Sequence, residues 1–219
     1  MSTYQKDAQV GIQVREHLIQ CGVETPFVQR TPDQAKLEGL MKEFMAEFGL
    51  DLSDDSLAET PKRVAKLYAN EYFKGLDYMQ FPKATVIENK MKVDEMVVER
   101  SVTVNSLCEH HLLPIVGHAF VAYIPNEKVL GLSKLNRIVD FFSRRPQVQE
   151  RLTLQIYHAL SYLLATPDVA VMIDAEHMCV KTRGIQDACS ATVTSKLGGQ
   201  FLKHPVRAEF LSHCRGYRD

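Results

Sequence analysis

The feature that most constrains the fold of this chain is a change in the spacing of its apolar residues at about residue 91. Before that point, apolar residues recur every three or four positions, as on the buried face of a helix. After it they alternate with largely polar neighbours, as in a strand with one buried face: Met96, Val98, Val102 and Val104. We therefore expect an N-terminal helical region, residues 1–90, followed by a sheet-containing domain, residues 91–219.

The first region carries signals for three helices. One covers residues 1–22 and is expected to be loosely attached. Another starts at Thr31-Pro32 and ends at Gly49, and a third is capped by Thr60 and ends at Gly75. The second of these helices is expected to bury one apolar face, which consists of Leu37, Leu40, Met41, Phe44 and Phe48.

The second domain reads in the order strand, strand, helix, helix, strand, strand. The strands are expected from about residue 91 to 104 and at residues 115–124, 169–181 and 189–195. Ser133 is expected to cap the first of the two helices, and the other begins after Pro146. Because the connections within each strand pair are short, we expect an α+β fold with an antiparallel sheet and both helices on one face.

Composition excludes several classes of protein. The 219 residues include 26 Lys and Arg against 27 Asp and Glu, which argues against a nucleic-acid-binding protein. No run approaches the roughly 18 apolar residues that a membrane span needs, and the first 22 residues have no apolar core of a signal peptide. Five cysteines without a dense pattern disfavour a disulfide scaffold. We expect a cytoplasmic protein with no membrane partner.

Two segments pair cysteine with histidine. Cys108 and His111 are three residues apart in a loop between two strands, and strand alternation places His177 and Cys179 on one face. The Cys108/His111 pair alone is at least as consistent with a buried cysteine beside surface histidines as with a metal site. Together the two pairs predict zinc. Four ligands make a closed structural site, whereas three leave a position for an activated water, and the spare His110 leaves both alternatives open.

A second group of residues favours anion binding. Ser133, Lys134 and Arg137 lie at a predicted helix start, where free backbone N–H groups attract phosphate. Residues 130–151 hold five cations against two carboxylates, and Arg183 and Arg63 can add to this group. For Arg144 and Arg145 we expect an ordinary solvated basic face.

Glu150 is a carboxylate inside this cationic region. By itself it is typical of a surface helix residue. A carboxylate beside a phosphate site can also accept hydrogen bonds from guanine N1–H and N2–H2, a pair of donors that adenine lacks. The residues alone therefore predict a zinc site beside a purine nucleotide pocket.

Six segments between about residues 57 and 202 resemble the GTP cyclohydrolase I family, in that family's order. The segment Ile87–Met96 is similar to the bacterial form. The six segments are Thr60-Pro-Lys-Arg63, Cys108-Glu-His-His-Leu-Leu-Pro114, Gly117–Pro125, Gly131-Leu-Ser-Lys-Leu-Asn-Arg137, Arg145-Pro-Gln-Val-Gln-Glu-Arg-Leu152 and His177-Met-Cys-Val-Lys-Thr-Arg-Gly184.

The resemblance implies the tunnelling fold, in which subunit sheets join into a barrel, and a homodecamer of two pentamers. It also implies an enzyme that converts GTP and water to formate and 7,8-dihydroneopterin triphosphate, the first step of tetrahydrofolate biosynthesis. The implied zinc ligands are Cys108, His111 and Cys179, and the implied proton-transfer residues are His110 and His177, with Ser133. Substrate binding falls to Glu150 for guanine and, for the triphosphate, to Lys134, Arg137, Arg183 and Arg63.

Two rival functions remain at this stage. One is another pterin or deazapurine enzyme of the same fold. The other is a zinc-stabilised nucleotide-binding protein without catalysis, which would bind GTP and release no formate.

Overall fold

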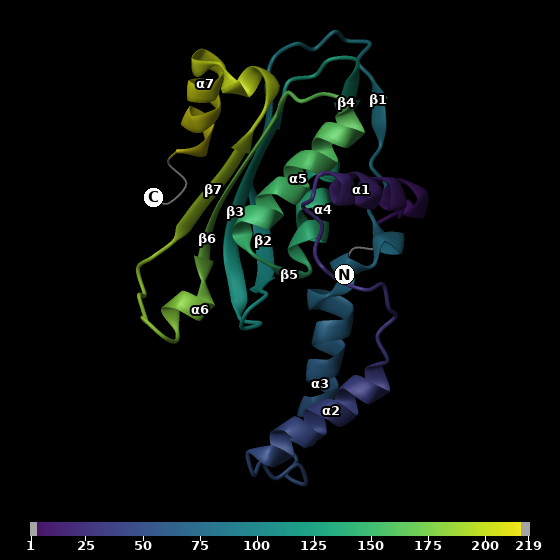
Figure 1. Cartoon of the computed structure of the whole chain (residues 1–219), viewed down its shortest axis with the longest axis vertical. Coiled ribbons are helices and arrows are strands. Elements are labelled where there is room, and N and C mark those ends of the chain that lie inside the picture. Colours follow the sequence, from purple (N-terminus) through teal and green to yellow (C-terminus); the bar gives the residue numbers. More distant parts are fainter. Residues whose placement is uncertain (1–3, 216–219) are drawn as a thin grey trace.

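The computed structural model describes residues 4–215, and its centre is a five-stranded sheet of order β5-β2-β3-β6-β7 (Figure 1). Four strands run antiparallel to their neighbours: β2 (Val97–Cys108), β3 (Pro114–Tyr123), β6 (Val169–His177) and β7 (Thr192–Leu197). The short β5 (Pro146–Gln147) adds a parallel edge at the end of β2. The expected strand pairs are confirmed, and β5 is an addition to them.

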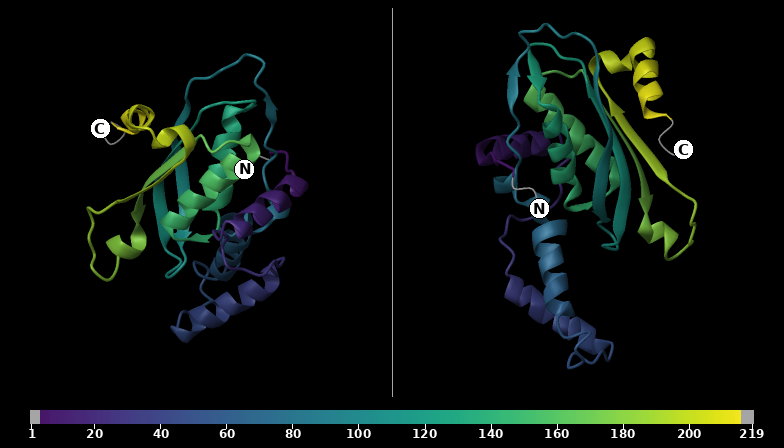
Figure 2. Two further views of the ribbon diagram at one scale, coloured as in Figure 1. Left: turned by 45° about the horizontal axis from the view of Figure 1, so that its top comes forward. Right: turned by 180° about the vertical axis from the view of Figure 1, so that it is seen from behind.

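The two helices between the strand pairs cover one face of the sheet, as predicted. They are α4 (Leu132–Ser143) and α5 (Gln149–Leu164), and their buried side chains form the main core with alternate residues of β3 and β6. The remaining residues of those strands face the other way, where α7 (His204–Cys214) packs against Phe120, Ala122 and Ala170 (Figure 2). Phe210 of α7 and Phe201 of the preceding turn η4 (Gly199–Leu202) are fully buried there.

The N-terminal helix α1 (Ala8–Gln20) is firmly packed, so the expectation of loose attachment was wrong. Its Val14 and Leu18 are fully buried in the main core, against α5. Gly11 lies so close to the turn η3 (Tyr78–Gln80) that a Cβ there would meet the Tyr78 carbonyl oxygen at 2.3 Å. The residues before Tyr4 in the predicted 1–22 helix lie outside the described residues.

The next two helices pack against each other and extend away from the sheet (Figure 1). Helix α2 (Gln34–Glu47) begins after Asp33, whose carboxylate accepts a hydrogen bond from the Lys36 amide, and not at Thr31-Pro32. Thr60 is the first residue of α3 (Thr60–Leu67) and not its cap. Helix α3 ends at Leu67 and not at Gly75, and the chain continues through the π-helical segment η1 (Tyr68–Tyr72) and the 3₁₀-helical turn η2 (Lys74–Leu76).

The apolar face predicted for α2 is largely uncovered in the single chain. The exposed fractions of Leu40, Phe44 and Phe48 are 52%, 59% and 71%. Periodicity predicted the helix correctly, but the predicted burial of this face is not observed within the single chain.

Further element ends differ from prediction: β2 spans Val97–Cys108 and not residues 91–104. Gly131 precedes α4, so Ser133 lies within its first turn and caps nothing. Strand β6 stops at His177, and residues 178–181 form the short helix α6 (Met178–Lys181). Strand β7 starts at Thr192, three residues later than predicted.

A small second sheet pairs β1 (Val86–Glu88) with β4 (Lys128–Leu130). None of the helices in residues 4–215 is long and apolar enough to span a bilayer.

Candidate active site

The candidate site lies at one end of the sheet, where β2 ends and β3 begins. The loop between them is a tight turn: the Cys108 amide donates to Leu113 O and the Leu112 amide donates to Cys108 O, both at 2.8 Å. The strand register places His177, the last residue of β6, beside Ile115 at the start of β3. It also places Cys108 beside Gln147, just before α5. Segments far apart in the sequence therefore meet here.

Cys108, His111 and Cys179 bring their donor atoms together. These atoms all lie within 4.8 Å of one another, and Cys108 Sγ is 3.8 Å from His111 Nδ1. Cys108 is buried, Cys179 is half-buried and His111 is exposed. Cys179 reaches the group from the helical turn α6, so the predicted strand alternation was the wrong reason for its position.

The chemistry of these three donors fits a zinc ion. Both cysteines are free thiols, and burial together with the neighbouring Cys108 thiol raises the pKa of Cys179. A divalent cation bound between the two sulfurs would stabilise both as thiolates. A mixed set of thiolates and imidazole suits zinc better than it suits calcium or magnesium.

His177 lies outside this group of donor atoms and is held by Gln149. Its Nε2 is 2.8 Å from Gln149 Oε1, while the Gln149 amide nitrogen donates to the carbonyls of Ile173 and Thr192 at 3.1 and 2.8 Å. The amide oxygen must therefore face His177, so Nε2 carries the proton and Nδ1 keeps its lone pair. Burial lowers the pKa of His177, an effect that nearby Glu150 opposes.

Gln149 was not identified from the sequence. A glutamine beside Glu150 carries no chemical signal of its own, and its importance comes from being fully buried at the start of α5.

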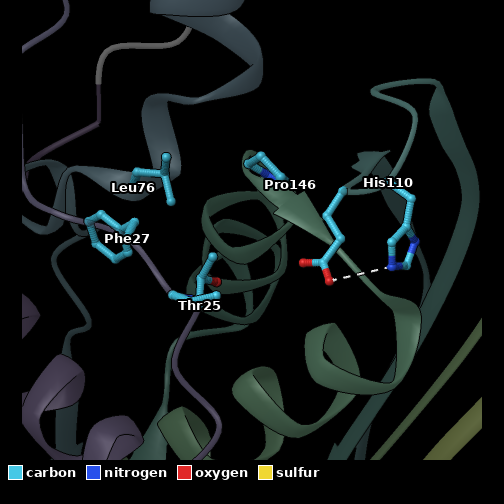
Figure 3. Close-up of a pocket in the computed structure, with 7 residues that line it drawn as sticks. Thr25, Phe27, Leu76, His110 and Pro146 are labelled. Carbon is cyan, nitrogen blue, oxygen red and sulfur yellow. Dashed lines mark ion pairs between the residues drawn. The ribbon is translucent and has the colours of Figure 1, made fainter.

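His110 is on the open side of the turn. Its side chain is 63% exposed, its Nδ1 is 3.8 Å from Cys108 Sγ, and its Nε2 is 3.8 Å from the Glu109 carboxylate. Glu109 also pairs with Arg151. Figure 3 shows that His110 and Glu109 line a pocket whose other walls come from Thr25, Pro26, Phe27, Leu76 and Pro146.

Two of the predicted substrate-binding residues also lie at this end of the sheet. Glu150 is exposed in the first turn of α5, where the helix N-terminus favours a carboxylate, and it is close enough to His177 to influence its pKa. Arg183 is exposed just after α6, and its guanidinium donates to His111 Nε2.

The other predicted anion-binding residues lie elsewhere in the chain. Ser133, Lys134 and Arg137 occupy the first turns of α4, whereas Ser143 at the other end of α4 leads to β5 beside Cys108. At a rise of 1.5 Å per residue, Ser133 is about 15 Å from that end along the helix axis. Arg137 instead lies 5.2 Å above the ring of Tyr4. Arg63 is exposed on α3. One chain thus does not bring all the predicted residues into one pocket.

The expectation of a solvated face was wrong for Arg145. Its side chain is fully buried, pairs with Glu24 at 3.2 Å, and donates to the carbonyl oxygen of Gly75. Its guanidinium also stacks within about 5 Å of the rings of Tyr78, Phe141 and Phe142. Arg144 is partly exposed and pairs with Asp140. Arg145 therefore ties the N-terminal segment to the main core.

Comparison with known proteins agrees with the family resemblance of the six sequence segments. The family model described as GTP cyclohydrolase I matches residues 37–215. Among curated relatives, the "GTP cyclohydrolase 1" of Aeromonas salmonicida is 56% identical over 95% of this chain and 98% of its own length. The same-named proteins of Aeromonas hydrophila and Erwinia tasmaniensis are 59% and 57% identical, over 91% and 98% of this chain and 94% and 99% of their own lengths. The protein therefore belongs to the GTP cyclohydrolase I family.

Proposed function

We propose that the protein catalyses the zinc-dependent hydrolysis of GTP at C8 of guanine. The products are formate and, after rearrangement of the ribose, 7,8-dihydroneopterin triphosphate, which starts tetrahydrofolate biosynthesis. The observation that carries the proposal is the convergence of Cys108, His111 and Cys179 beside an independently held His177, in a chain of this family. A nucleotide-binding protein without catalysis would release no formate. Another pterin or deazapurine enzyme of the same fold would have a different pattern of site residues.

Cys108, His111 and Cys179 are the proposed zinc ligands. When bound there, zinc supplies Lewis acidity and lowers the pKa of a water to about 7 in a site with an open position. His177 is engaged with Gln149 and is not needed as a ligand, which favours three protein ligands over a closed Cys2His2 site.

His177 is the proposed proton donor to guanine N7. Because Gln149 holds the Nε2 proton, Nδ1 is the atom that takes up a proton and passes it on. Protonated N7 makes C8 electron-poor and open to attack by hydroxide. His110 and Ser133 are the remaining candidates for the proton transfers that open the ribose and close the pterin ring.

Glu150 and the cationic side chains are the proposed GTP-binding residues. The Glu150 carboxylate accepts hydrogen bonds from N1–H and N2–H2 of guanine. Arg183, whose guanidinium donates to His111, is proposed to contact the triphosphate. Lys134, Arg137 and Arg63 are the other proposed contacts to the triphosphate.

We also propose that these residues come together in a homo-oligomer, a decamer of two pentamers. Three observations support assembly. The α4 residues are distant from Cys108 within one chain. The face of α2 that holds Leu40, Phe44 and Phe48 is uncovered. In the described residues β7 pairs only with β6, which leaves its outer edge open to a second sheet. We place the enzyme in the cytoplasm, since its five free thiols suit a reducing compartment.

The test is incubation of the zinc-loaded protein with GTP, with formate and nucleotides measured. We expect formate from the wild-type protein and almost none from Cys179→Ser, which should also lose zinc. His110→Ala and His177→Ala should keep near-stoichiometric zinc and lose turnover. His177→Ala should leave GTP intact, while His110→Ala should accumulate a formylated or ring-opened intermediate. Zinc loss in His177→Ala would instead indicate the closed four-ligand site, and GTP binding without formate would indicate a non-catalytic protein.

A further inference from the structure

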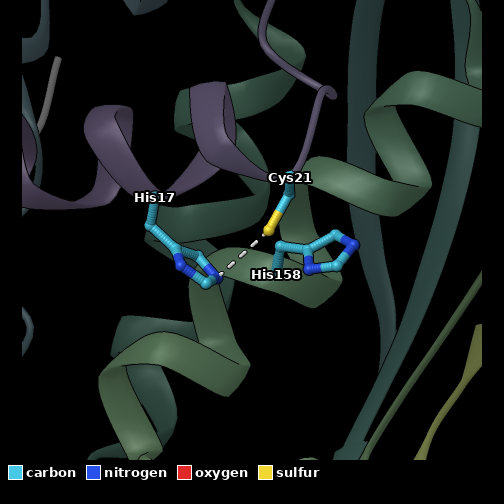
Figure 4. Close-up of side chains that lie close together, drawn as sticks. All are labelled: His17, Cys21 and His158. Atoms are coloured by element: carbon cyan, nitrogen blue, oxygen red, sulfur yellow. Dashed lines mark hydrogen bonds between the residues drawn. The ribbon is translucent and has the colours of Figure 1, made fainter.

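A second group of side chains that can bind a metal joins α1 to α5. None of these side chains belongs to the proposed active site. His17 of α1 and Cys21, the residue directly after α1, are four residues apart and so lie on one side of the helix, and His158 of α5 lies beside them (Figure 4). Their donor atoms all lie within 4.8 Å of one another. His158 is nine residues beyond Gln149, about 13 Å along the helix, so this group is separate from the Cys108 site.

The distance between Cys21 Sγ and His17 Nε2 is compatible with binding to one metal ion. In a tetrahedral zinc site, bond lengths of about 2.3 Å to sulfur and 2.0 Å to nitrogen put the two donors about 3.5 Å apart. Cys21 Sγ and His17 Nε2 are 3.6 Å apart. The Cys108 and His111 donors of the first site are separated by a similar 3.8 Å. Half-burial of all three side chains shields the group while leaving a route for an ion.

Neighbouring rings hold the histidines in place. The His17 ring lies 5.0 Å from the ring of Tyr162, and the His158 ring lies 5.1 Å from that of Tyr157. Lys196 is the nearby cation, and its ammonium lies 5.3 Å from the Tyr157 ring centre. A Cys21 thiolate supplies the negative charge that offsets it when a divalent ion binds.

We propose that His17, Cys21 and His158 form a second zinc site that fastens the N-terminal helix to α5. One thiolate and two imidazoles favour zinc over hard cations, and water fills the fourth position. A metal bound only in the folded state adds to stability, so this site strengthens a contact that Val14 and Leu18 already make.

Cobalt titration tests the site directly. In a Cys108→Ser/Cys179→Ser protein the first site has lost both of its thiolates, so a thiolate-to-cobalt charge-transfer band reports on another cysteine. We expect one Co²⁺ per chain with this band. Adding Cys21→Ser should abolish it, and adding Cys189→Ser, which alters an exposed cysteine outside the cluster, should not. Absence of the band, or its persistence with Cys21→Ser, would overturn the proposal.

Zinc content of otherwise intact proteins provides a second measurement that does not require the double variant. After equilibration in a zinc buffer and gel filtration, the wild-type protein should hold two zinc ions per chain. His158→Ala should hold one and still release formate, and Cys189→Ser should hold two. A wild-type content of one, or a content of two in His158→Ala, would contradict the second site. Loss of formate release from the wild-type protein would bear on the proposed function alone.

Discussion

Glu150 is the proposed guanine-binding residue, yet it looks ordinary in the sequence. An exposed carboxylate in the first turn of a helix is common, and only its position beside His177 makes it a candidate for guanine recognition. Its position in the fold, and not its residue type, is therefore the reason to assign Glu150 to guanine binding.

Glu150→Gln should therefore weaken GTP binding and leave zinc content unchanged. The amide keeps the shape but presents a donor where guanine N1–H or N2–H2 needs an acceptor. Loss of a charged hydrogen bond costs about 1.5–3 kcal/mol, or roughly a 10- to 150-fold increase in KM. Steady-state kinetics and metal analysis would measure both effects. Glu88→Gln is the matched control, since Glu88 is exposed on β1. An unchanged KM in Glu150→Gln would remove this residue from the pocket.

Arg145 carries a second prediction at the residue scale. Arg145→Met leaves the Glu24 carboxylate, which is only 8% exposed, without its charged partner. Breaking a buried ion pair costs about 3–5 kcal/mol of unfolding free energy. Arg144→Met, which breaks the more exposed pair with Asp140, should cost about 1 kcal/mol or less. Denaturant unfolding would compare the two, and adding Glu24→Gln to Arg145→Met should recover part of the loss. Equal losses from the two arginine variants would contradict this account.

At the scale of elements, the period of the apolar residues predicted which segments are helices and which are strands, but not where they end. The strand expected over residues 169–181 ends at His177, and the helical turn α6 begins at the next residue. No change in residue type marks that point in the sequence. The sequence predicted an exposed side chain for Arg145 because arginine side chains are usually exposed. The three-residue metal group was predictable only in part, because the spacing of His177 and Cys179 was read as strand alternation.

The proposed second metal site has one recognisable signal in the sequence. His17 and Cys21 have the four-residue spacing of a helix face within a segment correctly predicted to be helical. The third member, His158, lies 137 residues further along the chain than Cys21 and carries no pattern of its own. Only the packing of α1 on α5 brings it within reach.

The packing of α1 leads to a prediction with an internal control. Leu18→Ala removes a fully buried side chain from the main core and should cost about 2–5 kcal/mol of unfolding free energy. The neighbouring Ile19 is 54% exposed, so Ile19→Ala should change stability by about 0.5 kcal/mol or less. Thermal or urea unfolding would test the difference. Similar stabilities for the two variants would mean that α1 contributes little to the core.

At the scale of the whole molecule, the proposed active site is split. The end of the sheet that holds Cys108 and His177 has Glu150 and Arg183 but lacks most of the proposed triphosphate contacts. Lys134 lies about 13.5 Å from the Ser143 end of α4 along the helix axis, which is too far for a side chain to cover. A second copy of the chain can supply these residues if the copies are arranged symmetrically, since each then gives and receives the same surface.

Shared sites predict that two inactive variants can restore each other. Cys179→Ser should lose zinc, and Lys134→Ala should lose triphosphate binding, so each protein alone should release little formate. When the two are unfolded together and reassembled, about a quarter of the sites should combine an intact metal half with an intact Lys134, if subunits mix at random. Formate release should rise to about that fraction of the wild-type value. A mixture of separately reassembled variants is the control and should stay inactive. No gain on co-assembly would mean that Lys134 and Cys179 act within the same chain, or that Lys134 does not bind substrate, and the proposed division of the site between subunits would be wrong.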